Sequence, residues 1–489
     1  MQLIDKDLLS IQETRQLIAA AKAAQQEFAS KSQEEVDRIV KAIADAGVCN
    51  AERLAVMANE DTGFGVPAHK KIKNVFASRN VYEAIKDIKT VGEISRDEVR
   101  GIRAVAVPVG VIAGLIPSTN PTSTVLYKSM IALKAGNAIV FSPHPSALRC
   151  IQETVKIVRE AIAKAGGNEN LVTCISIPTP QATDCLMKHR DIALILATGG
   201  SAMVRAAYSS GTPAIGVGPG NGPAYIERSA DIPLAVKRIL DSKTFDNGTI
   251  CASEQSVVCD TDMRPAVQAE MEKQGAYFLN ADEKAKLSKF ILRPNGTMNP
   301  QIVGRSVQDI AELSGITVPK TARVLVVDED KVGKCYPFSQ EKLAPILAFY
   351  MAENYEKVCE LCCRILLFEG AGHTFSLHTK DDKMVDYFAK NIPVSRVMVN
   401  TPSALGGIGA TTNLMPSLTL GCGAVGGSAT SENVGPLQLM NIRYAAFGTV
   451  ELDDIMAGMP KSENTCSNDV DPALVESIVK NIIQRFQTK

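Results

Sequence analysis

The amino-acid sequence predicts an α/β protein with two parallel β-sheets. Short apolar runs alternate with amphipathic stretches along most of the chain, a pattern typical of strands that helices connect and cover. The chain is also long, at 489 residues, so it can bury a large core divided between two or three domains. We expect one sheet before Cys251 and the other after it.

The chain is expected to begin with helices. Between Asp7 and Ala46 apolar side chains recur three or four residues apart, which places them on one face of a helix. The residues on this face are Leu17, Ile18, Ala21, Ala24 and Phe28. Later apolar runs are short, and we expect them to be strands. They cover residues 104–115, 138–141, 192–197, 256–259, 324–327, 364–368 and 396–400.

Three segments are expected to lie outside the sheets. Residues 87–107 are more polar than their surroundings and carry Gly92 and Gly101, which favours a protruding hairpin. Residues 458–470 are rich in turn-forming residues and predict a linker. Residues 471–489 predict an amphipathic helix. Two interpretations of this helix stay open: it docks on a partner groove, or it folds back on its own subunit.

Composition and charge limit the classes of partner. The net charge of -1 argues against nucleic acid or an anionic membrane as the main partner. The apolar runs are too short to span a bilayer. The first residues lack the basic and then apolar plan of a secretion signal. We therefore expect a cytoplasmic protein that acts on small molecules.

Cysteine usage predicts reduced thiols. Twelve cysteines in a chain of this length do not make a dense disulfide framework. One Cys-x-x-Cys motif joins Cys359 and Cys362, with Cys363 beside it. No second pair or nearby histidine completes a zinc site there. We interpret the motif as structural and expect no bound metal.

Cys251 is the first candidate catalytic residue. Its neighbours between Asn247 and Gln255 are small and polar and leave the sulfur accessible. An accessible thiolate that nearby donors stabilise is a good nucleophile for covalent catalysis. We expect a turn at Gly248 and a helix start near Ala252, whose free N–H groups would face the sulfur. The alternative is a small buried thiol with a structural role.

Asn120 is the second candidate. It lies in the loop 116–122, after the apolar run 104–115. A loop asparagine can direct its side-chain N–H₂ group at an oxyanion that develops during acyl transfer. The alternative is an ordinary turn residue before a proline, which in isolation is the commoner case.

Together, the Cys251 segment and the Asn120 loop resemble the aldehyde dehydrogenase superfamily. The resemblance extends over about residues 10–445 and is closest to the CoA-acylating branch, especially the aldehyde dehydrogenase half of bifunctional aldehyde-alcohol dehydrogenases. It implies an aldehyde dehydrogenase-like fold with a protruding oligomerisation hairpin, and hence a homodimer or homotetramer. Other matching segments are 341–346, 416–423 and 431–436.

The resemblance also implies domain boundaries. Residues 1–240 would form the dinucleotide-binding domain, with the hairpin at 87–107 for oligomerisation. Residues 241–425 would form the catalytic domain with the nucleophilic cysteine, and residues 426–457 would return to the oligomerisation region. The tail helix resembles the peptides that tether enzymes inside bacterial microcompartments, which adds such a compartment as a possible location.

One departure from the hydrolytic enzymes of this family has a mechanistic consequence. Where those enzymes carry a glutamate that activates water, this chain has Val217, in a glycine-rich loop that ends at Gly222. Valine cannot take a proton, so a thioester on Cys251 would be protected from water. An incoming thiol attacks as a thiolate without that base, which makes coenzyme A the expected acceptor. The loop is not a dinucleotide fingerprint, because Pro219 interrupts it and a strand is expected next.

A nicotinamide cofactor is implied by the residues after the expected strand 192–197. Thr198, Gly199, Gly200 and Ser201 predict a tight turn before a helix, where backbone N–H groups can approach a phosphate. In the resembled family this turn lies beside the dinucleotide pyrophosphate. Many α/β turns share the pattern without binding a ligand.

Further cofactor-binding positions are implied by the resemblance alone. The Glu341 carboxylate matches the position that accepts a hydrogen bond from the nicotinamide ribose, and Gly218 is assigned to the same site. Ser142 and Pro143 stand where hydrolytic relatives have a lysine for the adenosine end. The choice between NAD and NADP therefore stays open.

His373 matches a histidine of the aldehyde-alcohol dehydrogenase branch that is expected near the active cysteine. Imidazole titrates near neutral pH, so this residue could polarise the sulfur or guide the CoA thiol. The alternative is a structural histidine bonded to the backbone.

These residues together predict an NAD(P)-dependent, CoA-acylating aldehyde dehydrogenase. Cys251 would attack a short aldehyde, and Asn120 and the Cys251 backbone N–H would hold the oxyanion. The acyl group would then pass reversibly from sulfur to CoA. Acetaldehyde is the expected substrate, while propionaldehyde and sulfoacetaldehyde stay open. The alternatives are a hydrolytic dehydrogenase that releases a free acid and a non-catalytic scaffold of the same fold.

Overall fold

The computed structural model describes residues 5–458, 473, 475–477, 479 and 480. These residues form two compact units. The larger unit contains the described residues up to Ile94 and from Val105 to Arg443, and it holds both parallel sheets. The smaller unit contains Ser95–Ala104 and the described residues from Tyr444 onward.

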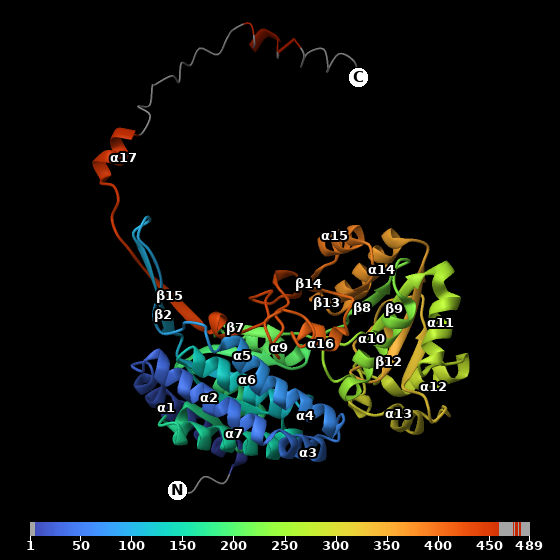
Figure 1. The fold of residues 1–489 in the computed structure, drawn as a ribbon, viewed down its shortest axis with the longest axis horizontal. Helices are drawn as coiled ribbons and strands as arrows, with labels where there is room; N and C mark the ends of the chain where they lie inside the picture. Colours follow the sequence, from blue (N-terminus) through green and yellow to red (C-terminus); the bar gives the residue numbers. More distant parts are fainter. Residues whose placement is uncertain (1–4, 459–472, 474, 478, 481–489) are drawn as a thin grey trace. The chain divides into compact units, whose positions relative to one another are not determined.

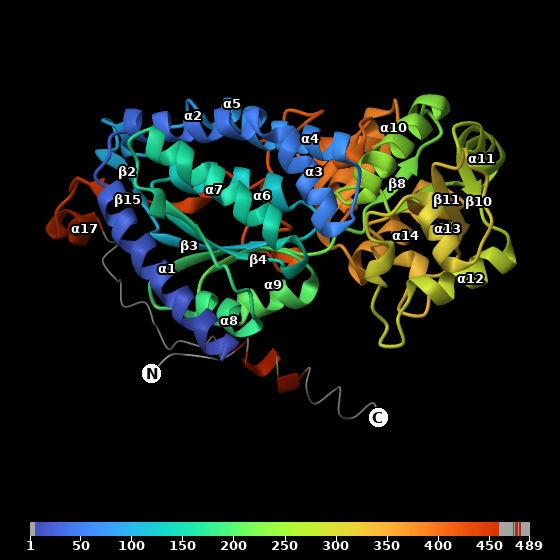
Figure 2. The ribbon, with the colours of Figure 1, turned by 90° about the horizontal axis from the view of Figure 1, so that it is seen from below.

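A five-stranded sheet forms one half of the larger unit (Figures 1 and 2). Its order is β5-β4-β3-β6-β7, and all neighbouring strands are parallel. The strand order reverses between β3 and β6, and ligands of such sheets bind in the crevice beyond the carboxyl ends of these strands. The strands are β3 Val111–Ile116, β4 Ala138–Pro143, β5 Val172–Cys174, β6 Ile192–Thr198 and β7 Ala214–Val217.

Helices cover both faces of this sheet (Figure 2). One face packs against α6 Pro121–Lys134 and α7 Leu148–Lys164, and the other against α1 Lys6–Phe28, α8 Pro180–Lys188 and α9 Ser201–Tyr208. The helical start predicted from the apolar spacing is confirmed, because Ile18, Ala21, Ala24 and Phe28 of α1 are buried. Further helices pack outside α6 and α7 or continue toward the site. They are α2 Gln33–Cys49, α3 Ala51–Thr62, α4 Pro67–Val75, a π-helical turn Phe76–Asn80 and α5 Val81–Ile85.

A seven-stranded parallel sheet forms the other half of the larger unit, in the order β10-β11-β12-β9-β8-β13-β14. Successive residues of β9 serve opposite cores, with Val258 on one side and Val257 and Cys259 on the other. The strands are β8 Pro223–Ile226, β9 Ser256–Asp260, β10 Ala276–Phe278, β11 Val324–Asp328, β12 Ile346–Ala352, β13 Gly372–His378 and β14 Val394–Val399. Burial on both faces explains why β9, β11 and most of β12 are nearly continuous apolar runs.

Helices also cover this second sheet (Figure 1). One core is closed by α10 Ile232–Thr244 and α11 Arg264–Lys273. The other core is closed by α12 Ala281–Ile291, α13 Val307–Ser314, α14 Tyr355–Phe368 and α15 Asp382–Asn391. The short α16 Ser403–Gly407 contacts α10 and the end of the sheet. The predicted α/β class with two parallel sheets is therefore confirmed.

A third sheet of three strands has the order β1-β2-β15. Its strands are β1 Gly92–Asp97, β2 Ile102–Pro108 and β15 Met440–Ala446, and α17 Leu452–Gly458 follows. The segment 87–107, expected as a hairpin, contains β1 and most of β2. The expected linker at 458–470 and tail helix at 471–489 lie, apart from a few residues, outside the described part of the chain.

Two strand predictions need correction. The run 104–115 is divided between β2 and β3, because Gly110 breaks it with a φ of 131°. The run 364–368 is not a strand but the end of α14. Its buried residues Ile365 and Leu366 continue the helical spacing of the preceding turns, whereas Leu367 is 64% exposed. The periodicity of the whole helix, and not the local apolar run, decides its structure.

Among the described residues, no helix is both long enough and apolar enough to cross a membrane.

Candidate active site

A cavity of about 520 Å³ lies beyond the carboxyl ends of the five-stranded sheet. Asn120 follows β3 and Gly199 follows β6, and both line this cavity. Cys251 and Glu341 line it from the other half of the unit, each shortly before a strand begins. The two candidate catalytic residues therefore meet in the crevice that the strand order indicates.

The backbone before Cys251 turns through three successive left-handed residues. Asp246, Asn247 and Gly248 have φ angles of 50°, 53° and 75°. This conformation is rare for residues other than glycine and requires support from surrounding contacts. The turn brings Cys251 to the cavity wall, where it is half-buried.

The helix start expected near Ala252 is not present. Ser253 N donates to Ile250 O at 2.9 Å, which makes a turn, and the chain then enters β9 at Ser256. Gln255 N donates to Gly222 O at 2.8 Å and ties this segment to the neighbouring loop. Sheet pairing therefore takes the place of the expected helix.

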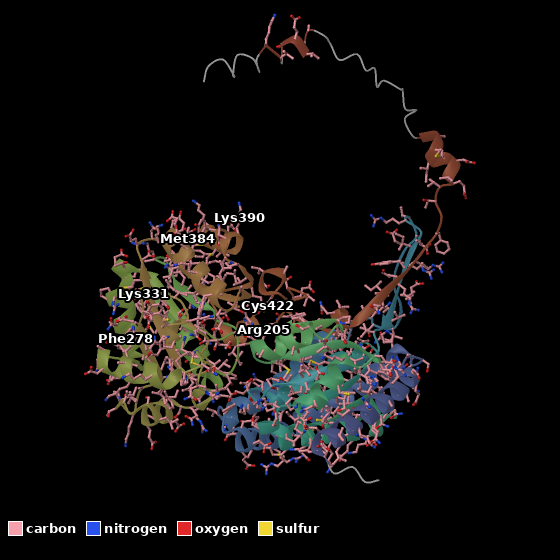
Figure 3. The ribbon with its side chains drawn as sticks, turned by 180° about the vertical axis from the view of Figure 1, so that it is seen from behind. Arg205, Phe278, Lys331, Met384, Lys390 and Cys422 are labelled. Atoms are coloured by element: carbon pink, nitrogen blue, oxygen red, sulfur yellow. The ribbon has the colours of Figure 1, made fainter. Side chains whose placement is uncertain are left out.

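Cys251 is a neutral thiol at neutral pH in this structure. Burial raises the pKa of its thiol to about 12, and the carboxylate of Glu341 and the thiol of Cys422 act in the same direction. The Arg396 guanidinium opposes the rise. Cys422, labelled in Figure 3, is itself buried, and burial also raises its pKa. The stabilised thiolate expected from the sequence is thus not found in the resting structure.

Asn120 stands at the N-cap position of α6, but its side chain does not cap the helix. Its Nδ2 donates to Thr249 O and to Thr119 Oγ1, both at 3.2 Å. Its Oδ1 accepts a hydrogen bond from Lys73 Nζ. The amide nitrogen is thus directed to the segment that carries Cys251.

A buried charged cluster lies behind Asn120, and no local sequence pattern predicts it. Lys70 and Lys73 of α4 both donate to the Asp246 carboxylate, the former at 3.1 Å. Asp246 also accepts from Val66 N at 2.7 Å and from Thr249 Oγ1 at 2.7 Å. In the sequence, two lysines three residues apart on a helix indicate a solvent-exposed face of that helix. Their carboxylate partner is 173 or more residues away in the chain, so no local pattern predicts the cluster.

The charges of this cluster stay paired despite burial. Burial lowers the pKa of Lys73 to about 8, and the Asp246 carboxylate opposes this change. Burial alone would raise the pKa of Asp246, but the two lysines hold it below its usual value. Lys73 is therefore mainly a cation and Asp246 an anion at neutral pH.

The loop after β7 passes close to the cysteine. Val217 is buried at the end of β7 and lines the cavity. A Cβ at Gly220 would lie 2.0 Å from Cys251 O and 3.1 Å from His373 Cε1, so a side chain does not fit there. The strand β8 follows at Pro223, and the rejection of a dinucleotide fingerprint is consistent with this geometry.

The turn after β6 reaches the same cavity. Thr198, Gly199 and Gly200 line it, whereas Ser201 is the exposed first residue of α9. The Thr198 hydroxyl is buried, and it lacks a hydrogen-bond partner among the described residues. Gly218 also lines the cavity. A buried hydroxyl without a partner, next to the N-terminus of a helix, is suited to donate a hydrogen bond to an anionic group of a ligand.

Of the other residues predicted to bind the cofactor, one lines the cavity and two do not. Glu341 lines the cavity, and its Oε1 accepts from Gly220 N at 2.8 Å. Ser142 is buried, and its hydroxyl lies 2.8 Å from Thr183 Oγ1 instead of facing the cavity. Pro143 is also absent from the cavity lining. The lining side chain from this segment is that of His144, together with Ser146.

His373 lies behind the cavity wall and does not line the cavity. It is fully buried in β13, and its Nδ1 lies 2.8 Å from Thr374 Oγ1. Burial, assisted by the Arg396 charge, lowers the pKa of His373 to about 3. The imidazole is therefore neutral near pH 7. Its Nε2 has no hydrogen-bond partner among the described residues.

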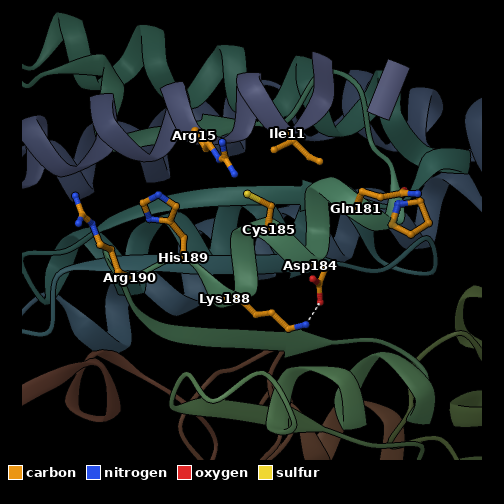
Figure 4. Close-up of a pocket in the computed structure, with 9 residues that line it drawn as sticks. Ile11, Arg15, Gln181, Asp184, Cys185, Lys188, His189 and Arg190 are labelled. Carbon is orange, nitrogen blue, oxygen red and sulfur yellow. Dashed lines mark ion pairs between the residues drawn. The ribbon is translucent and has the colours of Figure 1, made fainter. Parts of the chain in front are cut away.

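A larger hollow of about 900 Å³ lies on the surface between α1 and α8 (Figure 4). Arg15 lines it from α1 and Cys185 from α8, and an ion pair of 2.8 Å joins Asp184 to Lys188 at its edge. No residue predicted for catalysis or cofactor binding lines this hollow. The chemistry-bearing residues gather instead in the smaller cavity.

Comparison with known proteins gives consistent matches. The family model described as "Aldehyde dehydrogenase family" matches residues 7–411. The bifunctional aldehyde-alcohol dehydrogenase AdhE of Escherichia coli strain K12 is 45% identical over 442 residues, which cover 89% of this chain and 50% of that protein. The chain thus spans about half the length of the curated relatives that it matches first.

Two solved structures are similar over nearly the whole chain. A probable aldehyde dehydrogenase from Listeria monocytogenes has a TM-score of 0.91 and 64% identity, with 92% of this chain and 100% of that chain covered. An acetylating aldehyde dehydrogenase from Geobacillus thermoglucosidasius has a TM-score of 0.91 and 51% identity, with 94% and 100% covered.

Proposed function

The chain belongs to the aldehyde dehydrogenase family, and we propose that it converts a short-chain aldehyde reversibly to an acyl-CoA through a thioester on Cys251. The observation that carries this proposal is the composition of the cavity wall. Val217 lines the same cavity as Cys251 and Asn120, and the resemblance to hydrolytic aldehyde dehydrogenases matches it to their water-activating glutamate. Relatives named as acetylating enzymes support the same reaction class.

The chemistry of the first half-reaction follows from Cys251 and Asn120. The thiol proton of Cys251 passes to solvent water, the sulfur bonds to the aldehyde carbon, and the carbonyl π-bond breaks so that its oxygen becomes an oxyanion. Asn120 Nδ2 and the Cys251 backbone N–H are assigned as its hydrogen-bond donors. A nicotinamide cofactor held by the turn after β6 would supply the acceptor for the hydride that leaves the aldehyde carbon, which takes that carbon to the oxidation level of a thioester.

The second half-reaction exchanges one thioester for another. The CoA thiolate attacks the acyl carbon, the bond to Cys251 breaks, and the same donors hold the oxyanion again. Val217 gives water no base for a competing attack. Among the described residues that line the cavity, Glu341 carries the carboxyl group. Burial raises the pKa of Glu341 to about 8, and the nearby Glu369 carboxylate adds to this rise. We assign Glu341 to the cofactor ribose and not to water activation.

The residues that would hold the cofactor are those of the turn after β6. Thr198 and the backbone of Gly199 and Gly200 are assigned to the pyrophosphate, and Gly218 is assigned to the same site. The orphaned Thr198 hydroxyl supports this assignment. His144, which lines the cavity, replaces Ser142 and Pro143 as the group we assign to the adenosine end. The preference for NAD or NADP is left to experiment.

A homo-oligomer is proposed on the basis of the strands β1, β2 and β15. Apolar side chains of β15 and the following residues are exposed, including Ile442 at 43%, Tyr444 at 68% and Phe447 at 57%. Such exposed apolar side chains are typical of surfaces that another chain covers. A cytoplasmic location, and encapsulation inside a microcompartment through residues 471–489, stay predictions.

The deciding experiment is an assay of the purified protein with acetaldehyde, propionaldehyde and sulfoacetaldehyde. Each aldehyde is tested with NAD and NADP, with and without CoA, and products are identified as acyl-CoA or free acid. We expect NADH or NADPH formation that depends on CoA and yields a stoichiometric acyl-CoA. Fast formation of free acid without CoA would contradict the proposal and indicate a hydrolytic enzyme.

A further inference from the structure

The ammonium group of Lys73 bridges the Asp246 carboxylate and the amide oxygen of Asn120. We propose that Lys73 is a positioning residue that fixes the orientation of the Asn120 amide, so that its N–H₂ group, and not its oxygen, faces the oxyanion formed at Cys251. This inference deepens the proposed function and rests on it.

The chemistry of the two side chains sets the direction of the amide. A lysine ammonium group is a donor only, so its partner on Asn120 must be Oδ1. The amide is planar, and Nδ2 therefore points away from Lys73. It donates to Thr249 O at 3.2 Å, two residues before Cys251. Without Lys73, an orientation with Oδ1 toward the substrate becomes accessible, and it would repel the oxyanion.

Lys73 is itself held in place by contacts on several sides. It donates to Asp246, whose carboxylate also accepts from Lys70 and Thr249. Lys73 Nζ lies 3.3 Å from Thr249 Oγ1 as well. The side chains of both lysines are only 3% exposed and that of Asp246 is 0% exposed. A fully partnered buried network of this kind has few alternative arrangements.

Stability alone is a poor explanation for this cluster. Burying charges is costly, and well-packed apolar side chains in their place are often neutral or stabilising. The cluster contains two lysines and one carboxylate, so it also leaves a net positive charge behind the amide that faces the oxyanion. Lys70 shares the burial and the Asp246 contact, but it binds Thr119 O instead of Asn120. The two lysines therefore form a matched pair for experiment.

The test uses the full chain with Lys73→Met, and with Lys70→Met as the matched control. Reduced-cofactor formation gives kcat and KM, and iodoacetamide labelling gives the reactivity of Cys251. We expect Lys73→Met to lose about 10- to 100-fold in kcat, with KM and labelling rate changed less than about threefold. Lys70→Met should lose a similar amount of thermal stability but less than about threefold in kcat. Equal kcat losses in both variants would overturn the proposal.

A double-mutant cycle separates positioning from a general structural effect. In an Asn120→Ala background, Lys73→Met should lower kcat by less than about twofold, because there is no amide left to orient. If Lys73→Met lowers kcat in the Asn120→Ala background as much as it does in the wild-type protein, the proposal is overturned. A wild-type kcat in the Lys73→Met single variant would also overturn it. If Lys73→Met does not fold, Lys73→Leu replaces it in the same cycle with the same expectations, because leucine also offers no donor to Asn120 Oδ1.

The cycle also distinguishes this inference from the proposed function. Reduced-cofactor formation is common to CoA-acylating and hydrolytic oxidation. If the wild-type protein makes free acid without CoA, the proposed function fails while the cycle still tests Lys73. If the wild-type protein oxidises no aldehyde in the panel, both fail together.

Discussion

Asn120 Nδ2 lies 3.2 Å from the carbonyl oxygen of Thr249, two residues before Cys251. This hydrogen bond joins the loop after β3, in one sheet, to the segment before β9, in the other. An amide nitrogen and a sulfur that are 131 positions apart in the sequence are thereby placed at one cavity.

Asn120→Ala removes the proposed side-chain donor to the oxyanion. We expect kcat to fall about 10²- to 10³-fold, because one preorganised donor of this kind has that effect in acyl-transfer enzymes. Steady-state assays of acyl-CoA formation measure the change. Circular dichroism and thermal melting control for folding, since the substitution also removes an acceptor from the buried Lys73 ammonium group and a donor from Thr249 O, and should therefore lower the stability. Unchanged kcat would remove Asn120 from the mechanism.

Gly220→Ala introduces a Cβ where the structure has no room. That atom would lie 2.0 Å from Cys251 O, and backbone cannot move aside as a flexible side chain can. We expect a loss of about 1–3 kcal/mol in the free energy of unfolding and a clear drop in kcat, because the cysteine segment must shift. Denaturant unfolding and activity assays measure both.

The matched control for Gly220→Ala is Gly448→Ala. A Cβ at Gly448 meets no atom within 4 Å, so this substitution should leave the free energy of unfolding nearly unchanged. Equal stability of the two variants would mean that the loop after β7 does not press against Cys251.

The pH dependence of alkylation reports the raised pKa of Cys251. Only the thiolate reacts with iodoacetamide, and the thiol pKa is about 12 in the cofactor-free protein. The labelling rate at Cys251 should therefore rise about tenfold per pH unit between pH 7 and 10, without a plateau. Peptide mapping by mass spectrometry is required because Cys49 and Cys335 are also exposed. A plateau near pH 7 would show a stabilised thiolate instead.

Glu341→Gln tests the second cause of the raised pKa of Cys251, which is the charge of the Glu341 carboxylate; the first cause is burial. Glu341 ionises near pH 8, and its carboxylate then disfavours a second negative charge on Cys251. Removal of the carboxyl group should speed labelling of Cys251 above pH 8 and change it little at pH 6, where Glu341 is protonated. The same variant should raise the KM for the nicotinamide cofactor if Glu341 holds the ribose.

The sequence predicted the features that depend on local patterns and missed those that depend on distant contacts. Apolar runs located β4, β6, β9 and β11 because strands buried on both faces are mostly apolar along their length. The run 364–368 failed because one face of a buried helix supplies the same local composition. The domain boundary at residue 240 stays a prediction.

In the candidate site, too, the sequence predicted the residues that a local pattern marks and missed those that depend on distant contacts. Cys251 and Asn120 were recognised from their segments, and the structure brings them to one cavity. Lys73 was missed because its role depends on Asp246, which is 173 residues away. The sequence left two interpretations of His373 open, a residue that acts on the sulfur or the CoA thiol and a structural histidine. Its burial, which one residue alone does not reveal, lowers its pKa to about 3.

Val217→Glu tests whether the absence of a base protects the thioester. Val217 is 4% exposed and lines the cavity with Cys251, so a carboxylate there can reach a water near the acyl carbon. We expect free-acid formation without CoA to appear in the variant, with a loss of stability because a charge is partly buried. Val217→Gln is the matched control, since it has similar size and polarity but cannot take a proton. If both variants release acid equally, residue 217 does not decide between water and CoA.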